Sequence, residues 1–486
     1  GLTGLWLLKI VLLALCAALL WRALGLYGIG AAGRGLGLMV WALALDAAND
    51  IRPENFSLLF FILLWIYSES RRLGKLKDPG LGAEICGFAV FFALWANFHP
   101  GFLYGLALAA LFAIGRSLRE RSSLPMLIIA AGTVGALANP HAGAVYTVPW
   151  RHLKEMRDLT VFINEWRQAS ILQVSQWPFW ALFTTAYAAV IFRWLLRRDV
   201  PFEHIAALLL LGLSSARHVR TTAYFSAAAV PIAAAALAGF STAKRGAVLR
   251  RVLFAAGILS AGAFFATALL PALRSMQPFN YMNVPHGAVP FLAANRKALG
   301  RLKMFNTWHW GGYLGFRLYP DYPVFVDGRY IFHPLLRPKY RATKNPEAFK
   351  SFLGNHKVDL VVIARSTRLR RSELRLPGGQ SLFVMRPFYV EFLPVSDWGL
   401  VYWDKQGYVF VRRSAVEKSW LRKREYRWFR PDDLTSAQLL LRAGKIPRAA
   451  LAAEVGRFAG WTPNEGDARA AQFWLKTVLA PVPGTR

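Results

Sequence analysis

Long apolar runs separated by short polar loops fill the first part of the chain. Ten of these runs reach or approach the length of about 20 residues that spans a bilayer as a helix. They cover residues 2–21, 35–50, 54–69, 83–97, 101–116, 124–139, 178–196, 203–216, 222–240 and 252–270. Several are shorter than a full span and adjoin Gly or Pro, which is typical of helices that line a cavity. The pattern predicts a polytopic transmembrane domain over residues 1–270.

The pattern changes after Pro271 to that of an α/β domain. The run "VDLVVIA" is typical of a buried strand, "GLVYWDKQGYVFVRR" of a hairpin, and "PVFVDGR" of a strand that ends in a turn. The stretch "NPEAFKSFLGNH" predicts an amphipathic helix with Asn345 as its N-cap and Pro346 at its first position. We therefore predict an α/β domain over residues 271–430.

The last segment, residues 431–486, is rich in Ala, Leu and Arg. Its stretch "SAQLLLRAGKIPRAALAAEVGRF" resembles one helical hairpin of a tetratricopeptide-type unit. A single unit of this kind cannot bury its own apolar face, so we expect it to pack on the rest of the chain. The predicted fold is a polytopic α-helical membrane protein of about ten visible spans, with a C-terminal extracytoplasmic α/β domain and a short helical tail.

The charges of the loops predict the orientation of the spans. The loops "SRRLGKLKDPG", "GRSLRERSS", "RWLLRRD" and "STAKRGAVLRR" are strongly basic, and they alternate with the less basic "NFHPG", "NPHAG" and "SSARHVR". The positive-inside rule places the basic set in the cytoplasm, so the chain after Pro271 lies outside it, in the periplasm where there is one. The same parity places Gly1 outside. Because the chain opens in an apolar run without a signal peptide, we expect at least one further span and an outer loop before Gly1.

The composition predicts an anionic partner and argues against nucleic acid. The chain is 55% hydrophobic and 18% charged, and its formal net charge is +32. Residues 271–486 carry about twenty more cations than anions. No nucleic-acid motif accompanies this charge, so an anionic membrane surface or a phosphorylated glycan is the expected partner. Cys16 and Cys86 lie inside apolar runs, which argues against a disulfide framework.

Polar residues gather at the outer ends of the predicted spans, where they are costly and tend to mark a site. The inner loops offer scattered cations. Arginines and a neighbouring histidine suit a phosphate or pyrophosphate, carboxylates suit the orientation of an acceptor hydroxyl, and amides and histidines beside Pro100 and Pro140 suit a cavity wall. The candidates are Glu165, Asp46 and Asp50 for catalysis; Arg217, His218, Arg220 and Arg52 for the donor phosphate; and Asn97, His99, Asn139 and His141 for the cavity.

Structural alternatives stay open for each group. Outer loops are polar in any membrane protein, and arginines at span ends also reach lipid headgroups. Arg217 pairing with Asp50 or Glu165 would hold helices together. Asp327-Gly328 is a common turn dipeptide, and Asp327 pairing with Arg329 or Arg317 would be architectural. The loop histidines raise the alternative of a divalent metal, but no HxxxH or Cys/His spacing supports one, and we assign no metal or cofactor.

The order of the motifs resembles a known group of proteins. The motifs are "IRPENFSLLF", "LWANFHPGFLYGL", "ANPHAGAVYTVPW" with a following "NEW", then "ARHVR", "WGGYLGFRLYPDYPVFVDGR" and "WGLVYWDKQGYVFVRR". Together they resemble bacterial membrane proteins of the GT-C glycosyltransferase superfamily, near its protein O-mannosyltransferase and aminoarabinose transferase branches. The resemblance covers nearly the whole chain. It implies an active site at the outer membrane face, a polyprenyl-phosphate-linked sugar donor and a soluble C-terminal domain that caps the site.

The resemblance also implies that the acidic residue of the first outer loop has no counterpart here, and topology places that loop before Gly1. We therefore expect a membrane glycosyltransferase of the inner membrane. The alternatives are a non-catalytic structural or accessory subunit of a larger membrane assembly, with protein partners, and a flippase or transporter of a lipid-linked glycan. A transporter is expected to show an internal repeat between its halves, and the sequence has none that we can discern.

Overall fold

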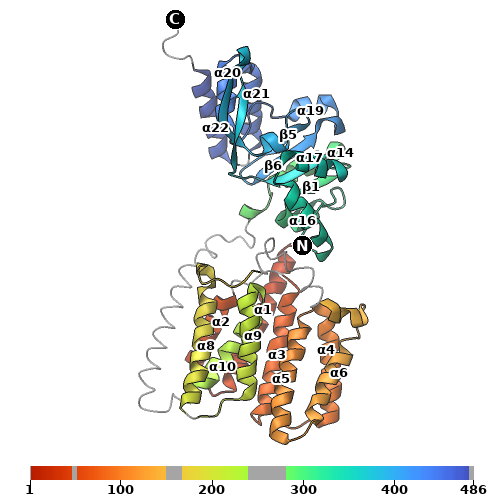
Figure 1. Ribbon diagram of the computed structural model, residues 1–486, viewed down its shortest axis with the longest axis vertical. Coiled ribbons are helices and arrows are strands. Elements are labelled where there is room, and N and C mark those ends of the chain that lie inside the picture. The colour runs from red at the N-terminus through yellow and green to blue at the C-terminus, as the bar shows by residue number, and fades with distance from the viewer. Residues whose placement is uncertain are drawn as a thin grey trace. The chain divides into compact units, whose positions relative to one another are not determined.

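The computed structural model describes residues 2–45, 52–148, 167–196, 198–238, 281–462 and 464–480. The chain divides into two compact units, Gly1–Pro278 and Phe279–Arg486, and each is described by itself (Figure 1). The prediction of an apolar helical part followed by an α/β part is confirmed. The predicted boundaries at 270/271 and 430/431 stay predictions, and the first lies outside the described residues.

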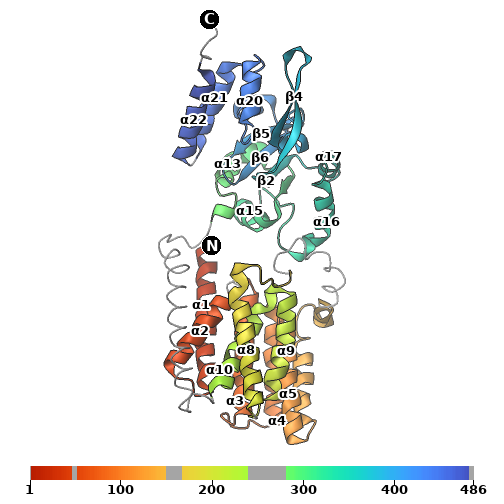
Figure 2. The same ribbon diagram turned by 60° about the vertical axis from the view of Figure 1, so that its left-hand side comes forward.

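The helical unit is built from long helices that run side by side in both views (Figures 1 and 2). Four described stretches are long and apolar enough to cross a membrane: Thr3–Gly25, Leu81–Phe98, Phe102–Glu120 and Val219–Ala238. The count of ten spans stays a prediction, and the run 252–270 lies outside the described residues. The helices are α1 (Leu2–Gly25), α2 (Ala31–Leu45), α3 (Glu54–Arg72), α4 (Leu81–Phe98), α5 (Phe102–Glu120), α6 (Leu127–Gly135), α8 (Trp177–Leu195), α9 (Phe202–Arg217) and α10 (Thr222–Ala238).

Helix α10 forms the centre of this unit. Its sequence is mostly alanine, and small side chains let neighbouring helices approach closely. It packs against α8, α2, α9, α3 and α1, and most of its residues are buried. By contrast, α1 exposes apolar side chains, including Leu7, Val11 and Leu15. A helix with this surface suits a lipid environment better than water.

Side-chain contacts separate the two ends of the helical unit. At one end, which we call the Arg220 end, Arg220 follows α9 in the chain and pairs with Glu54 at the start of α3. At the other end, which we call the Glu84 end, Arg116 of α5 pairs with Glu84 near the start of α4. Arg119, also near the end of α5, pairs there with Glu203 at the start of α9. Loops predicted to be outer therefore gather at the Arg220 end, and three loops predicted to be cytoplasmic adjoin helix termini at the Glu84 end.

The α/β unit contains a four-stranded sheet in the order β1-β2-β6-β5 and a two-stranded ribbon of β3 and β4. Strands β1 and β2 are parallel and the other pairs are antiparallel. The strands are β1 (Met304–Asn306), β2 (Leu360–Ala364), β3 (Leu369–Arg375), β4 (Ser381–Pro387), β5 (Trp398–Trp403) and β6 (Gly407–Arg412). The helices are α13 (Ala288–Ala294), α14 (Arg296–Leu299), α15 (Gly311–Leu318), α16 (His333–Ala342), α17 (Pro346–Asn355), α18 (Tyr389–Phe392), α19 (Lys418–Arg424), α20 (Leu434–Arg442), α21 (Arg448–Trp461) and α22 (Glu465–Leu479).

Both faces of the four-stranded sheet are covered, so its strands are apolar on both sides. Along β2, Val361 and Ile363 join one core with residues of α17, α20 and α21. The alternate residues, Leu360 and Val362, join a second core with residues of α13 and α15. This two-sided burial explains why "VDLVVIA" is a continuous apolar run, and the predicted strand is confirmed.

Two local predictions are confirmed by hydrogen bonds. The Asn345 side chain accepts from the backbone N–H groups of Glu347 and Ala348 and so caps α17. Strands β5 and β6 form the predicted hairpin, and the Asp404 carboxylate accepts from two backbone N–H groups in its turn.

The predicted strand over "PVFVDGR" differs from the structure. Residues 323–326 make no ladder, although they lie next to β1. The buried Asn306 side chain accepts from the N–H groups of Phe325 (2.8 Å) and Val326 (3.3 Å) and donates to the carbonyl of Val326 (2.8 Å). One amide side chain therefore satisfies the backbone groups that a neighbouring strand would otherwise pair, and an apolar pattern cannot reveal this substitution.

The helices of the tail are part of the same unit. The buried Glu454 carboxylate of α21 accepts hydrogen bonds from the backbone N–H groups of Arg427, Trp428 and Phe429, at 3.1, 2.9 and 2.8 Å. Its apolar side chains belong to the same core as the sheet. The hairpin thus packs on the rest of the chain, as expected of a repeat that stands alone.

Candidate functional site

Three separate segments of the chain meet in a charged cluster at the Arg220 end. Glu54 lies in the first turn of α3, His99 follows α4, and Arg220 lies in the short turn between α9 and α10. Arg220 Nε donates to Glu54 Oε2 at 2.8 Å, and Arg220 Nη2 lies 3.3 Å from His99 Nε2. Both members of the ion pair are partly exposed. The cluster therefore offers a guanidinium that is fixed by a carboxylate and still accessible.

A layer of buried polar groups lies beneath this cluster. Ser57 Oγ lies 3.0 Å from His99 Nδ1 and accepts from the Trp95 indole N–H at 2.8 Å. Gly101 allows this close packing, because a Cβ at that position would stand 2.3 Å from the Tyr224 hydroxyl and 2.5 Å from Ser57 Oγ. The Tyr224 hydroxyl is buried in the same layer and interacts with Ser57. The layer therefore orients His99 beneath the ion pair.

The other phosphate-binding candidates lie near this cluster in the chain. Arg52 lies two residues before Glu54 and is close enough to His99 to interact with it electrostatically. Arg217 ends α9, and both it and His218 are exposed. The turn after α9 is held by the segment that follows the long loop, because Val219 N–H donates to the carbonyl of Arg167 and Ala169 N–H donates to the carbonyl of Ala216, both at 3.0 Å.

The four cavity candidates differ in the contacts that they make, and their role in a cavity stays a prediction. The Asn97 amide donates to the carbonyl of Ala138 at 2.7 Å, which joins α4 to the end of the α6 segment. Asn139 accepts from the His141 backbone N–H at 2.8 Å in a tight turn. His141 is exposed. His99, the fourth, is the candidate that contacts Arg220. The catalytic candidates Asp46, Asp50 and Glu165 lie outside the described residues.

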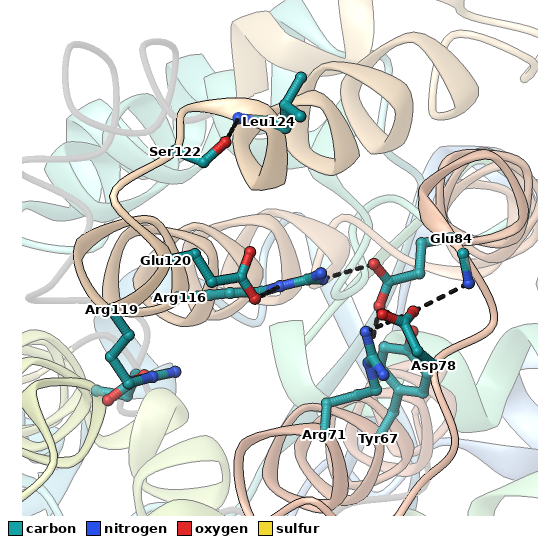
Figure 3. Close-up of polar contacts among 11 residues, drawn as sticks. Tyr67, Arg71, Asp78, Glu84, Arg116, Arg119, Glu120, Ser122 and Leu124 are labelled. Carbon is teal, nitrogen blue, oxygen red and sulfur yellow. Dashed lines mark hydrogen bonds and ion pairs between the residues drawn. The ribbon is translucent and has the colours of Figure 1, made fainter.

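The Glu84 end contains a buried ionic network that the sequence interpretation missed (Figure 3). Glu84, near the start of α4, accepts from Tyr67 Oη at 2.6 Å, Arg71 Nε at 3.1 Å and Arg116 Nη1 at 2.6 Å. Arg116 also pairs with Glu120, one turn further along α5. The Glu84 side chain is almost fully buried. One carboxylate thus joins α3, α4 and α5.

A second buried group links α3 to α9 at the same end. Glu69 pairs with Arg72 at 2.8 Å and lies 2.9 Å from His204 Nε2. Glu203, next to His204, pairs with Arg119 through Oε1, and its Oε2 has no partner among the described residues. Sequence reasoning saw only scattered cations in these loops. The available signal was the acidic residue inside each apolar run, because a buried carboxylate requires a partner.

The Asp327–Arg329 pairing, predicted as an architectural alternative, is present in the α/β unit. Asp327 is buried, and both of its carboxylate oxygens accept from Arg329 side-chain N–H groups at 2.8 to 3.0 Å. These hydrogen bonds and the Asp327 charge raise the pKa of the Arg329 guanidinium. As for metals, no group of three or more His, Cys, Asp or Glu among the residues that the structure describes could hold an ion.

Comparisons with known proteins find a likeness at the level of structure. No protein-family model matches the sequence, and no curated protein matches it. Among solved structures, the chain is similar to ArnT from Cupriavidus metallidurans in its apo state, with 16% sequence identity and a TM-score of 0.44. The similarity covers 85% of this chain and 84% of that chain. A likeness of this degree assigns no activity.

Proposed function

We propose that this chain is a GT-C-type glycosyltransferase of the bacterial inner membrane. It would move a sugar from a polyprenyl-phosphate-linked donor to an acceptor at the outer membrane face. The observation that carries the proposal is the cluster at the Arg220 end, where Glu54, His99 and Arg220 converge from three segments. The apolar exposed surface of α1 and the four helices of spanning length support a membrane location.

The cluster suits the departure of a phosphate. In the proposed reaction, an acceptor hydroxyl attacks the anomeric carbon, and the bond from that carbon to the phosphate oxygen of the donor breaks. The leaving phosphate gains negative charge, which Arg220 would stabilise as a fixed cation. Glu54 holds the guanidinium in place, so little ordering is needed when the donor binds. Exposed Arg217, three residues earlier, would supply a second cation.

A carboxylate would accept the proton of the acceptor hydroxyl. Glu165, Asp46 and Asp50 remain our candidates for this role. Glu54 itself is engaged with Arg220, which makes it a positioning residue in this scheme.

The test is a transfer assay on purified full-length protein with polyprenyl-phosphate-linked sugars. Arg220→Ala and Glu165→Gln are expected to lower turnover by roughly 10²-fold while leaving the folded fraction unchanged. Arg22→Ala, which removes an exposed arginine at the end of α1, is the control and should keep full turnover.

A different outcome would favour a structural role. If Arg220→Ala lowered thermal stability but left turnover per folded molecule intact, the ion pair with Glu54 would serve to join helices. If folded wild-type protein transferred no sugar from any donor tested, the transferase proposal would be wrong for the chain on its own, and the subunit alternative would stand.

A further inference from the structure

A surface pocket in the α/β unit is formed entirely by the stretch from Gly311 to Arg329. Its volume is about 390 Å³, and its walls come from α15 and the segment that follows it. Figure 2 shows α15 beside α13 on one side of the sheet. The volume lies in the range of roughly 300–1,000 Å³ that is usual for small-molecule sites. This pocket belongs to the α/β unit alone and shares no residue with the cluster around Arg220.

Two glycines of α15, Gly312 and Gly315, line the pocket, and close packing requires neither of them. A Cβ at Gly312 would meet nothing within 4 Å, and one at Gly315 would make an ordinary 3.6 Å contact with Val324. Glycine inside a helix costs about 0.5–1 kcal/mol relative to alanine. Gly311 differs, because a Cβ there would stand 2.0 Å from the Val326 carbonyl oxygen. Packing therefore explains Gly311, whereas Gly312 and Gly315 serve to leave space.

Aromatic side chains and one ion pair line the rest of the pocket. Phe316 is 52% exposed and Tyr319 is 78% exposed, so both rings are available to a ligand. Tyr322 is buried, and its hydroxyl donates to the carbonyl of Leu292 at 2.7 Å, so it contributes a fixed wall. Asp327 orients the Arg329 guanidinium, whose side chain is 64% exposed. The polar groups are thus held in place, while the rings are open to solvent.

This combination selects a class of ligand. The Asp327–Arg329 pair has no net charge, which disfavours a free phosphate or another small anion. A pyranose ring has an apolar face of C–H groups that packs on aromatic rings, and its hydroxyl groups accept hydrogen bonds from an exposed guanidinium such as that of Arg329. We propose that the pocket binds one neutral pyranose unit of a saccharide. The proposal does not rest on transferase activity, because binding is measured without turnover.

The experiment is ligand-observed saturation-transfer NMR on the full-length chain. The protein is held in a detergent without a sugar headgroup, since a maltoside would compete. The probes are free glucose, galactose, mannose, N-acetylglucosamine and xylose, with inorganic phosphate as the anionic counterpart. At least one sugar is expected to bind with a dissociation constant on the order of 1–10 mM. Phosphate is expected not to compete with it.

Matched variants separate the pocket from the rest of the surface. Phe316→Ala and Tyr319→Ala should each weaken sugar binding at least about fivefold, whereas Phe473→Ala and Tyr340→Ala, at exposed positions outside the pocket, should change it less than about twofold. Gly312→Ala should fold normally and also weaken binding, because it fills space without a clash.

Three outcomes would overturn the proposal. The first is that no sugar of the panel binds to folded protein. The second is that a sugar binds equally well to the pocket variants and to the controls. The third is that Phe316 and Tyr319 govern binding to anionic lipid vesicles and not to any sugar, in which case the two rings form a membrane-facing surface.

Discussion

Replacing Glu84 by Gln should weaken the helical unit strongly, because this carboxylate is the buried partner of two arginines. It accepts from Arg71 at 3.1 Å, Arg116 at 2.6 Å and the Tyr67 hydroxyl at 2.6 Å. Glutamine is nearly the same size but carries no charge, and its NH₂ group would face a donor. The variant therefore removes the charge and one or more hydrogen bonds without opening a cavity.

The size of the stability loss depends on which ion-pair partners Arg71 and Arg116 retain. Removing one partner of a buried ion pair costs about 3–5 kcal/mol. Arg71 retains Asp78, whose side chain is 65% exposed, and Arg116 retains Glu120, which is 47% exposed. The arginines are themselves partly exposed and can turn towards water. We therefore expect a loss of about 2–4 kcal/mol.

The assay is thermal unfolding of the purified protein in detergent, followed by intrinsic fluorescence. At about 2 °C for each kcal/mol, the midpoint should fall by roughly 4–8 °C. The control is Glu120→Gln, which removes an exposed partner of the same Arg116 and should cost less than about 0.5 kcal/mol. The double variant Glu84→Gln/Arg116→Gln should recover part of the loss, because it removes one uncompensated charge. Equal stability of Glu84→Gln and Glu120→Gln would refute the reasoning.

Three further predictions concern packing, topology and pH. Gly101→Ala should lower the unfolding midpoint, because its Cβ would stand 2.3 Å from the Tyr224 hydroxyl, and Gly82→Ala, with nothing within 4 Å, is the control; equal midpoints would contradict the packing. In a cysteine-free background, an impermeant thiol reagent on intact cells should label a cysteine at Lys350 but not at Lys77, and the reverse pattern would refute the predicted topology. Burial lowers the pKa of Lys339 to about 8, so above pH 8 the unfolded chain binds more protons than the folded one and stability rises with pH up to about 10.4. Lys339→Met should flatten this rise in melting curves between pH 7 and 10, and an unchanged slope would show that Lys339 titrates normally.

Much of the local structure could be predicted from the sequence, because it depends on neighbours in the chain. The cap at Asn345 needs only the next few residues, and the hairpin of β5 and β6 needs a turn between two apolar runs. The apolar run of β2 fixes its burial on both sides. The change from membrane-type helices to an α/β pattern follows from periodicity and composition in the same way.

The candidate site depends on contacts between helices that are distant in the sequence, which no local sequence pattern reveals. Arg220 and His99 were both candidates, but their contact, and the pairing of Arg220 with Glu54 across 166 positions, arise only when α3, α4 and α9 pack together. Sequence spacing also gave no means of distinguishing His99, which contacts Arg220, from Asn97, which joins two helices.

The sequence by itself determined which segments are apolar, which local caps and turns form, and which unit carries most of the positive charge. The tertiary structure decided which charges are buried together, as at Glu84, and where one side chain replaces a strand, as at Asn306. The physical reason is the distance along the chain over which each interaction acts. Propensity, capping and periodicity act over a few residues, whereas an ion pair or a shared amide is set by the positions of whole helices and strands.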